Sequence, residues 1–309
     1  MKRLVSTLNL SHEEWLRYRK RGIGGSDAGA ICGLNPYVTA MQVYHDKTSD
    51  TADDTDNEAM RQGRDLEEYV SQRFMEATGK KVRRANAIFY NEDNPFMLAN
   101  VDRLLVGEDA GLECKTASPY MADKWKDGEI PMHYQIQCHH YMAVCDTRAW
   151  YIAVLIYGKE FKFHKIERDE DIITDLIQIE KDFWENNVLG HTLPAPDGSK
   201  AADTVISNYF KETKPVSILL PPSFDGMLEH RQDLVSAIDE MKKEKKQIEQ
   251  ELKLYMGKAE TAENDQFKVS WKPVDSSRVD GNKLKEEQPE IYAKYQKTIH
   301  SRRFTINAA

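Results

Sequence analysis

Two carboxylates and a lysine stand close together near the middle of the chain, in an order suited to hydrolysis of a phosphodiester. Asp102 ends the segment 100–102 (NVD), and after a turn the segment 112–115 (LECK) follows. Alternate residues of a strand face the same side, so we expect Glu113 and Lys115 to project together while their neighbours point into the core. A short hairpin would bring Asp102 beside Glu113.

This set of side chains has the parts that metal-assisted hydrolysis needs. Asp102 and Glu113 on neighbouring strands would form a hard oxygen site of the kind that Mg²⁺ or Mn²⁺ prefers. The Lys115 ammonium would orient or help to deprotonate a water and stabilise the pentavalent phosphate. The alternative is a solvated cross-strand charge pattern, because a D…ExK match is short and arises by chance in long proteins.

The elements around this motif predict a mixed α/β domain over residues 1–195. Ser11 is the expected cap of the first helix, with Glu14 in the capping-box position. The patterns predict, in chain order, helix 11–21, a short helix from Ser26-Asp27 to about Gly33, helix 58–78, strands 81–90, 96–106 and 111–116, a helix from Pro131 to about Val144, strands 149–156 and 160–167, and helix 170–186.

A second region, 196–309, follows the expected linker 193–198 (LPAPDG). It contains a strongly helical segment, Phe224–Met256, whose apolar residues recur at mixed three-, four-, six- and seven-residue steps. This spacing favours a packing helix or one arm of a helical hairpin, since a long parallel coiled coil would need a more regular heptad. Strand-like runs at 267–271 and 304–306 and a short helix at 287–294 are expected in the tail.

The bulk composition describes an ordinary globular chain. Its 309 residues are 40% hydrophobic and carry a formal net charge of −8, to which the acidic run 49–58, an expected solvated loop, contributes. No apolar stretch approaches the roughly 20 residues of a membrane span, and the N-terminus lacks a secretion signal, so we expect a cytoplasmic protein. The four cysteines suit a reduced compartment. A zinc site from Cys138, His139, His140 and Cys145 is an alternative that crowds its ligands along one helix.

Five ordered motifs carry a resemblance to a known family. They are Trp15-x-x-x-Arg19 with 23–27 (IGGSD), Gly63-Arg64-x-x-Glu67, Asp102, Glu113-x-Lys115 and 134–137 (YQIQ). In this order they resemble the motifs of the YqaJ-type viral recombinases, to which lambda exonuclease belongs, over about residues 12–185. The resemblance implies a restriction-endonuclease-like mixed sheet core flanked by helices, of the PD-(D/E)xK nuclease superfamily, with a C-terminal helical extension. One departure is the residue pair before Asp102, which is Asn-Val where the family commonly has Pro.

The resemblance also implies roles for the matching residues. Asp102 and Glu113 would bind metal, with the Cys114 carbonyl as a further ligand, and Glu67 would complete a second metal position. The cofactor would be two Mg²⁺ ions, with Mn²⁺ able to substitute. Lys115 would be the catalytic lysine, and Gln135 would position the water or the scissile phosphate. For Glu67 and Gln135, an ordinary exposed place on a helix is the alternative.

A second group of residues would hold the 5′-phosphate of a DNA end. The resemblance assigns this role to Arg19 and Ser26, and Asp27 and Gln137 are further candidates for binding DNA. The glycine-rich start of a helix suits phosphate independently, because its free N–H groups attract anions. The alternatives are that Ser26 and Asp27 are caps only, and that Arg19 is a surface base for whose role Arg21 competes.

The expected function is that of a metal-dependent exonuclease that degrades duplex DNA from a 5′ end and leaves 3′ overhangs for recombination. By resemblance, its partners would be double-stranded DNA ends, a single-strand annealing protein and further copies of itself in a trimer. An endonuclease that uses the same site is one alternative. A non-catalytic DNA-binding or assembly protein is the alternative of another class.

Overall fold

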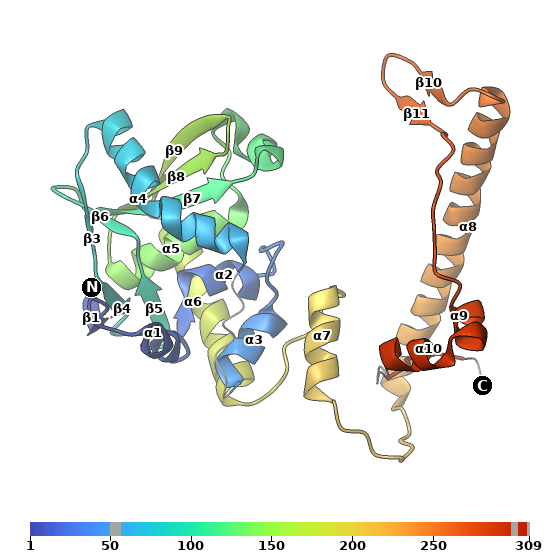
Figure 1. Ribbon diagram of the computed structural model, residues 1–309. Helices are drawn as coiled ribbons and strands as arrows, with labels where there is room; N and C mark the ends of the chain where they lie inside the picture. Colours follow the sequence, from blue (N-terminus) through green and yellow to red (C-terminus); the bar gives the residue numbers. More distant parts are fainter. Residues whose placement is uncertain (50–56, 298–301, 308–309) are drawn as a thin grey trace. The chain divides into compact units, whose positions relative to one another are not determined.

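The computed structural model describes residues 1–49, 57–297 and 302–307, and the chain divides into two compact units, 1–211 and 212–309 (Figure 1). The division follows helix α7 (Lys200–Tyr209), which packs against helix α3 (Ala40–Thr48) of the first unit. Most of the acidic run 49–58 lies outside the described residues. Among the described helices, none is both long and apolar enough to cross a bilayer.

Two sheets form the framework of the first unit. A four-stranded sheet has the order β1-β4-β5-β2, and a five-stranded sheet has the order β3-β6-β7-β8-β9. Their strands are β1 (Lys2–Ser6), β2 (Ile23–Gly24), β3 (Val82–Arg84), β4 (Ala87–Tyr90), β5 (Met97–Asn100), β6 (Arg103–Leu105), β7 (Ala110–Ala117), β8 (Ala149–Ile156) and β9 (Glu160–Glu167). The β2–β5 and β7–β8 pairs are parallel and the others antiparallel, so the prediction of a mixed α/β fold is confirmed.

Two of the predicted strands are each divided between the two sheets. The run 81–90 breaks into β3 and β4 at Asn86, whose φ of 49° lies in the left-handed region. The run 96–106 breaks into β5 and β6, and the residue before β6 is Asp102. The prediction of two continuous strands was therefore wrong. The segments β4 and β5 pair with β1 and β2, which are distant in sequence, and so they belong to the four-stranded sheet, whereas β3 and β6 belong to the five-stranded sheet. The second break places Asp102 where the two sheets meet.

Helices α4 (Glu58–Thr78) and α5 (Met132–Cys145) cover opposite faces of the five-stranded sheet. Along β8, Trp150, Ile152, Val154 and Ile156 pack in the cluster that contains α5, whereas the alternate residues pack with Phe74 of α4. Each such side chain contributes about 1.5–3 kcal/mol when it leaves water. Both helices begin and end close to their predicted positions, and the burial of both sheet faces holds them rigidly beside the strands.

The remaining helices frame one side of the unit. Helix α1 (His12–Arg19) begins at Ser11 with the predicted capping box to Glu14. Helix α2 (Gly25–Ile31) follows β2, and α6 (Glu170–Asp182) continues into a π-helical turn, Phe183–Leu189. Helices α3 and α7 and the 3₁₀ segment Pro119–Gly128 were not predicted.

The second unit is built on one long helix, α8 (Asp225–Met256), which the sequence predicts almost to the residue. A 3₁₀ turn, Pro222–Phe224, precedes it, and the hairpin of β10 (Thr261–Glu263) and β11 (Lys268–Ser270) follows. Helices α9 (Gly281–Glu287) and α10 (Pro289–Tyr295) come next. Residues 302–307 have no regular secondary structure, so the strand expected at 304–306 is absent.

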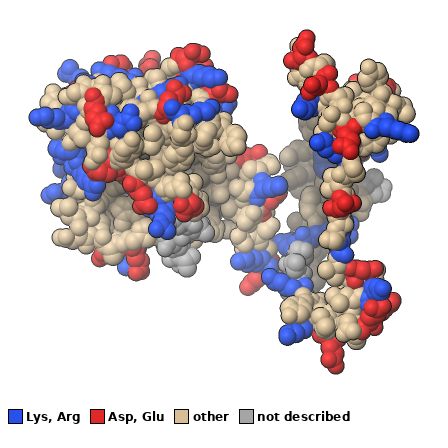
Figure 2. All heavy atoms as spheres, turned by 45° about the horizontal axis from the view of Figure 1, so that its top comes forward, with Lys and Arg blue, Asp and Glu red and all other residues tan. Residues whose placement is uncertain are grey.

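Basic and acidic side chains intermingle over the surface of each unit in the view of Figure 2. This face of the first unit shows no broad field of one sign. On this face, attraction for a polyanion would come from particular local groups.

Candidate active site

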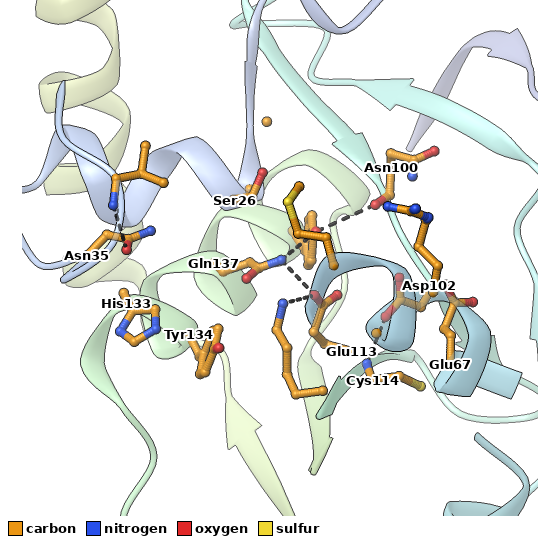
Figure 3. Close-up of a pocket in the computed structure, with 18 of the residues that line it drawn as sticks. Ser26, Asn35, Glu67, Asn100, Asp102, Glu113, Cys114, His133, Tyr134 and Gln137 are labelled. Carbon is orange, nitrogen blue, oxygen red and sulfur yellow. Dashed lines mark hydrogen bonds and ion pairs between the residues drawn. The ribbon is translucent and has the colours of Figure 1, made fainter. Parts of the chain in front are cut away.

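A cavity of about 790 Å³ opens in the first unit where the two sheets, α1, α2, α4 and α5 converge. Its lining joins residues of the predicted metal site with residues of the predicted DNA-binding group, which are distant in sequence (Figure 3). Of the predicted site residues, these line it: Arg19, Ser26, Glu67, Asp102, Glu113, Cys114, Lys115 and Gln137. The sequence motifs therefore do converge on one concave surface.

The β6–β7 hairpin brings the first two carboxylates together. Arg103 pairs with Leu112, which sets Asp102 opposite the next residue of β7, Glu113. The Cys114 N–H donates to Asp102 Oδ2 at 2.8 Å and holds this carboxylate across the hairpin. Leu112 is fully buried, as predicted, and Cys114 is half-buried against the α4 side of the core. The local alternation of β7 thus turns Glu113 and Lys115 to the cavity.

The Glu113 carboxylate is the centre of the polar contacts in the cavity, and Figure 3 shows two of them converging on it. Its Oε1 accepts from Lys115 Nζ at 2.6 Å and from Gln137 Nε2 at 2.7 Å. Its other oxygen, Oε2, is buried and has no hydrogen-bond partner among the described residues. A buried carboxylate oxygen without a donor is costly, so this atom is set to accept a cation or a donor that the protein itself does not supply.

The charges of this cluster act strongly on one another. Burial raises the pKa of the Asp102 carboxyl well above its usual range, and the Glu113 and Glu67 carboxylates raise it further. Burial alone would lower the pKa of Lys115, but Glu113, Tyr134 and Asp102 together outweigh it and raise the pKa of the ammonium above its usual range. The Lys115 ammonium also lies 4.7 Å from the centre of the Tyr134 ring, whose face favours a cation. The carboxylates of Asp102, Glu113 and Glu67 therefore lie close enough to repel one another, and Lys115 is the cation in contact with Glu113.

Glu67 reaches the cavity from α4, but its carboxylate is paired with Arg103. The Arg103 guanidinium is almost fully buried, and it also donates to the Asp102 backbone oxygen at 2.7 Å and to Glu68 at 3.0 Å. Arg103 thus clamps α4 to the hairpin. Sequence reasoning missed this residue, although a charged side chain within the apolar run 103–105 directly after Asp102 was a usable signal.

The structure places the two glutamines of α5 the other way round from the prediction. Gln137, a further candidate for binding DNA, is buried and donates to Glu113 and to the Tyr141 hydroxyl oxygen, the latter at 2.8 Å. Gln135, expected to position the water or phosphate, does not line the cavity, and its amide donates to Ile130 O at 2.7 Å. Two residues along a helix differ by about 200° in direction, so only one of them can face the strands.

Arg19 and Ser26 meet at another part of the cavity wall. Arg19 donates to Ser26 Oγ at 3.3 Å, and its guanidinium lies 4.9 Å from the centre of the Trp15 ring. A Cβ on Gly25 would lie 2.5 Å from the Tyr141 ring, so glycine is needed for the start of α2 to approach α5 this closely. Arg21, the competitor for the role of Arg19, stacks on Tyr18 and does not line the cavity.

Asp27, a further candidate for binding DNA, does not line the cavity, and its carboxylate lies behind Arg19 at 3.9 Å. Its Oδ2 accepts from the Gly24 N–H at 2.9 Å and from Lys47 Nζ at 2.7 Å. Burial alone would raise the pKa of Asp27, yet Lys47 and Arg19 hold it below its usual range. Asp27 therefore caps α2 and neutralises a lysine whose side chain is fully buried.

The donors at the hairpin suit a divalent cation with hard oxygen ligands. Asp102 and Glu113 are adjacent carboxylates, and the unpartnered Glu113 Oε2 is an available ligand atom. Glu67 is held by Arg103, and within the described ranges no three His, Cys, Asp or Glu side chains are grouped closely enough to form a complete metal cage. Of the alternative zinc ligands, His140 has both ring nitrogens engaged, with Glu180 at 2.7 Å and Leu98 O at 2.8 Å.

Comparisons with known proteins agree with the order of motifs. Residues 14–148 match the YqaJ-like viral recombinase domain family. The chain is 39% identical over 307 residues to an uncharacterised protein, YqaJ, of Bacillus subtilis (strain 168), and the match covers 98% of this chain and 96% of that protein. Such identity over nearly the whole of both chains includes the second unit.

Two solved structures are similar to the first unit in fold. One is the alkaline exonuclease LHK-Exo of Laribacter hongkongensis, with a TM-score of 0.50 and 16% identity over 64% of this chain and 98% of that one. The other is the same enzyme in complex with dAMP, with a TM-score of 0.50, 17% identity and the same coverage. At this level of identity the likeness establishes the fold and no more.

Proposed function

The chain belongs to the YqaJ-like viral recombinase family and has the fold of a phage-type alkaline exonuclease, and from this premise we propose that it is a metal-dependent deoxyribonuclease. The observation that carries the proposal is the Glu113 carboxylate, held by Lys115 and Gln137 beside Asp102 with one buried oxygen unpartnered. A buried carboxylate oxygen without a donor is costly, and a divalent cation bound beside Asp102 would give this one a partner.

Asp102 and Glu113 would hold the cation, with Glu67 and the Cys114 carbonyl as the further ligands that the family motifs imply. The proposed ions are Mg²⁺, for which Mn²⁺ would substitute. When bound, these ions would act as Lewis acids that polarise the phosphate, and they would lower the pKa of the attacking water. The excess of negative charge at Asp102 supports this assignment, because a divalent cation relieves the repulsion among the carboxylates.

The other side chains act on the phosphate and on the attacking water. Lys115, kept protonated by Glu113, would place its ammonium against the pentavalent phosphate and stabilise the charge that develops there. Gln137 fixes the orientation of Glu113 and thereby the direction of the free Oε2. Tyr134 shields the ammonium from water on one side, which strengthens its effect on the phosphate.

The proposed substrate is a duplex DNA end, degraded from its 5′ terminus to leave a 3′ overhang. Arg19 and Ser26 would bind the terminal 5′-phosphate, since a guanidinium and a hydroxyl already point toward each other on the same cavity wall. The complex of dAMP with LHK-Exo, an exonuclease of the same fold, supports DNA as the class of substrate. From the family, we also propose a single-strand annealing protein as partner and a trimeric assembly.

Digestion of linear duplex DNA by Glu113→Gln tests the proposal. The variant keeps the size of the side chain but removes its charge, so digestion in Mg²⁺ should fall at least about 1,000-fold. Glu167→Gln, an exposed glutamate on β9, is the matched control and should digest at the parental rate. Parental activity in folded Glu113→Gln would refute the nuclease assignment.

Closed circular duplex separates the exonuclease from an endonuclease that uses the same residues. An enzyme that requires an end leaves the circle intact while it degrades the linear form of the same DNA. Cutting of both forms at equal rates would retain the nuclease but reject the end-directed mode. Label at the 5′ or the 3′ terminus then reports the polarity.

A further inference from the structure

The exposed side of helix α8 carries a regular heptad pattern that the catalytic cavity does not use. One series, seven residues apart, consists of Met227, Leu234, Met241, Ile248 and Tyr255. A second series, three residues earlier in each heptad, consists of Phe224, Arg231, Ile238, Lys245 and Leu252. We call these ten positions the stripe. The mixed spacing of apolar residues found from the sequence includes Leu228, which lies outside the stripe. In heptad notation the second series occupies the a positions and the first the d positions.

The apolar members of this stripe lie in water. Their exposed fractions range from 41% to 89%, and Met256 is the one buried residue among those of α8. The helix has 32 residues, so the stripe is about 48 Å long. An apolar stripe of this length on a charged helix is typical of a surface that packs against another helix.

The two cations within the stripe indicate which partner fits. If two copies of α8 paired in parallel, Arg231 would meet Arg231 and Lys245 would meet Lys245 in the layers between the helices. At the flanks, Glu244 would face Glu249 of the other copy. Like charges opposed in this way destabilise a coiled coil and select against the pairing. The stripe therefore disfavours a parallel dimer, in agreement with the sequence argument.

If the second copy of α8 runs antiparallel, one register avoids all of these contacts between like charges. When Ile238 lies opposite Met241, the remaining layers follow from the heptad without further choice. They are Arg231 opposite Ile248, Leu234 opposite Lys245, Met227 opposite Leu252 and Phe224 opposite Tyr255. All ten stripe positions then have a partner, and no layer contains two cations.

Flanking acidic residues complete the match in this register. Arg231 would lie between Glu244 and Glu251 of the second copy, which stand four residues before and three after its partner Ile248. His230 would likewise lie beside Glu251. Lys245 has Glu249 of its own helix at 3.3 Å and can extend past Leu234 to water. Charge complementarity thus points to the same orientation as the layers.

We propose that α8 pairs with α8 of a second copy of this chain as an antiparallel two-stranded coiled coil, centred between Asp239 and Glu240. The contact is isologous, because the same stripe serves both copies about a twofold axis. It does not rest on the nuclease assignment, since it is argued from the residues of α8 alone.

Cysteine crosslinking of the full-length chain tests the orientation. Under mild oxidation, the double variant Arg231→Cys/Ile248→Cys should form a covalent dimer, because the two positions face each other in the antiparallel register. Each single variant should give no more dimer than the parent, whose four natural cysteines supply the baseline. Efficient crosslinking of Ile248→Cys alone would reveal parallel pairing and overturn the proposal.

Light scattering of the full-length chain tests the association itself. Ile238→Asp/Met241→Asp should weaken pairing at least about 100-fold and reduce the mass of the particle by half or more, because these two positions oppose each other in apolar layers and the introduced charges would meet there. Ser236→Asp/Gln250→Asp adds the same charge on the opposite side of α8 and should leave the mass unchanged. If the stripe variant kept the parental mass with α8 still helical, the stripe would serve another contact and the proposal would fall.

Discussion

Asp102 and Asp27 belong to the same unit, one in the cavity and one behind its wall, yet their surroundings are opposite. Asp102 faces two other carboxylates, and its pKa is raised. Asp27 is paired with Lys47 and caps α2, and its pKa is lowered. The protein neutralises Asp27, which caps α2, whereas it leaves Asp102, the proposed metal ligand, for a bound cation to neutralise.

Asp102→Asn tests the first half of this contrast and should have the largest effect. Without the charged ligand, digestion of duplex DNA should fall at least about 1,000-fold. In the absence of divalent ions the variant should be as stable as the parent or about 1 kcal/mol more stable, because one of three mutually repelling carboxylates is removed. Thermal unfolding with and without Mg²⁺ measures this.

In the same titration, Mg²⁺ should raise the unfolding temperature of the parent and have much less effect on Asp102→Asn. A variant that is both inactive and strongly destabilised without metal would show that Asp102 is a structural residue. The contrast with Asp27 would then fail.

Asp27→Asn tests the second half and should act on stability. It leaves the fully buried Lys47 ammonium without its main partner, so we expect a loss of about 3 kcal/mol in the free energy of unfolding. Activity per folded molecule should stay within about threefold of the parent, since Asp27 does not line the cavity. Denaturant unfolding and digestion assays on the same preparation separate the two effects.

The stabilisation of the folded state by Asp27 should depend on pH in a definite direction. The folded pKa lies below the unfolded value of about 3.9, so the stabilisation is complete above that value and is lost as the pH falls through the folded pKa. The stability difference between parent and Asp27→Asn should therefore be constant near neutral pH and shrink below about pH 4. A difference that persists unchanged in stronger acid would assign the effect to packing instead of charge.

Gln137→Ala and Gln135→Ala form a matched pair on α5, with an intermediate expected effect. Loss of Gln137 frees the Glu113 carboxylate to rotate, so digestion should fall about 10- to 100-fold. Loss of Gln135 removes a bond to the Ile130 backbone outside the cavity, and digestion should change by less than about threefold. If Gln135→Ala lowered kcat more than Gln137→Ala, the result would support the first prediction, that Gln135 positions the water or the scissile phosphate.

These glutamines also show which parts of the site the sequence could predict. Asp102, Glu113 and Lys115 are brought together by one hairpin, and the strand period of two was enough to orient them. The capping box at Ser11 is equally local. The face of α5 that meets the strands depends on packing with α2, where a Cβ on Gly29 would lie 2.8 Å from the Cβ of His133, and no local pattern encodes that contact.

The division of strands between two sheets was beyond sequence reasoning for a related reason. The runs 81–90 and 96–106 each have continuous strand propensity, and only pairing with β1 and β2, some 80 residues away, decides where they separate. Arg103 became a buried clamp through the same rearrangement, because the separation turns it toward Glu67. Long-range strand pairing thus determines the position of Arg103, which local sequence patterns did not predict.

Arg19→Ala should have the smallest effect and tests whether the cavity has a second functional end. The parent should digest a 5′-phosphorylated duplex about tenfold faster than the unphosphorylated one, because a guanidinium and the Ser26 hydroxyl would bind the phosphate. The variant should lose this preference by slowing on phosphorylated ends alone. Arg17→Ala, an exposed arginine on the same helix paired with Glu13, is the control and should keep it. If the parent digests both ends equally, Arg19 belongs with Asp27 among the structural charges, and only the carboxylate end of the cavity takes part in the reaction.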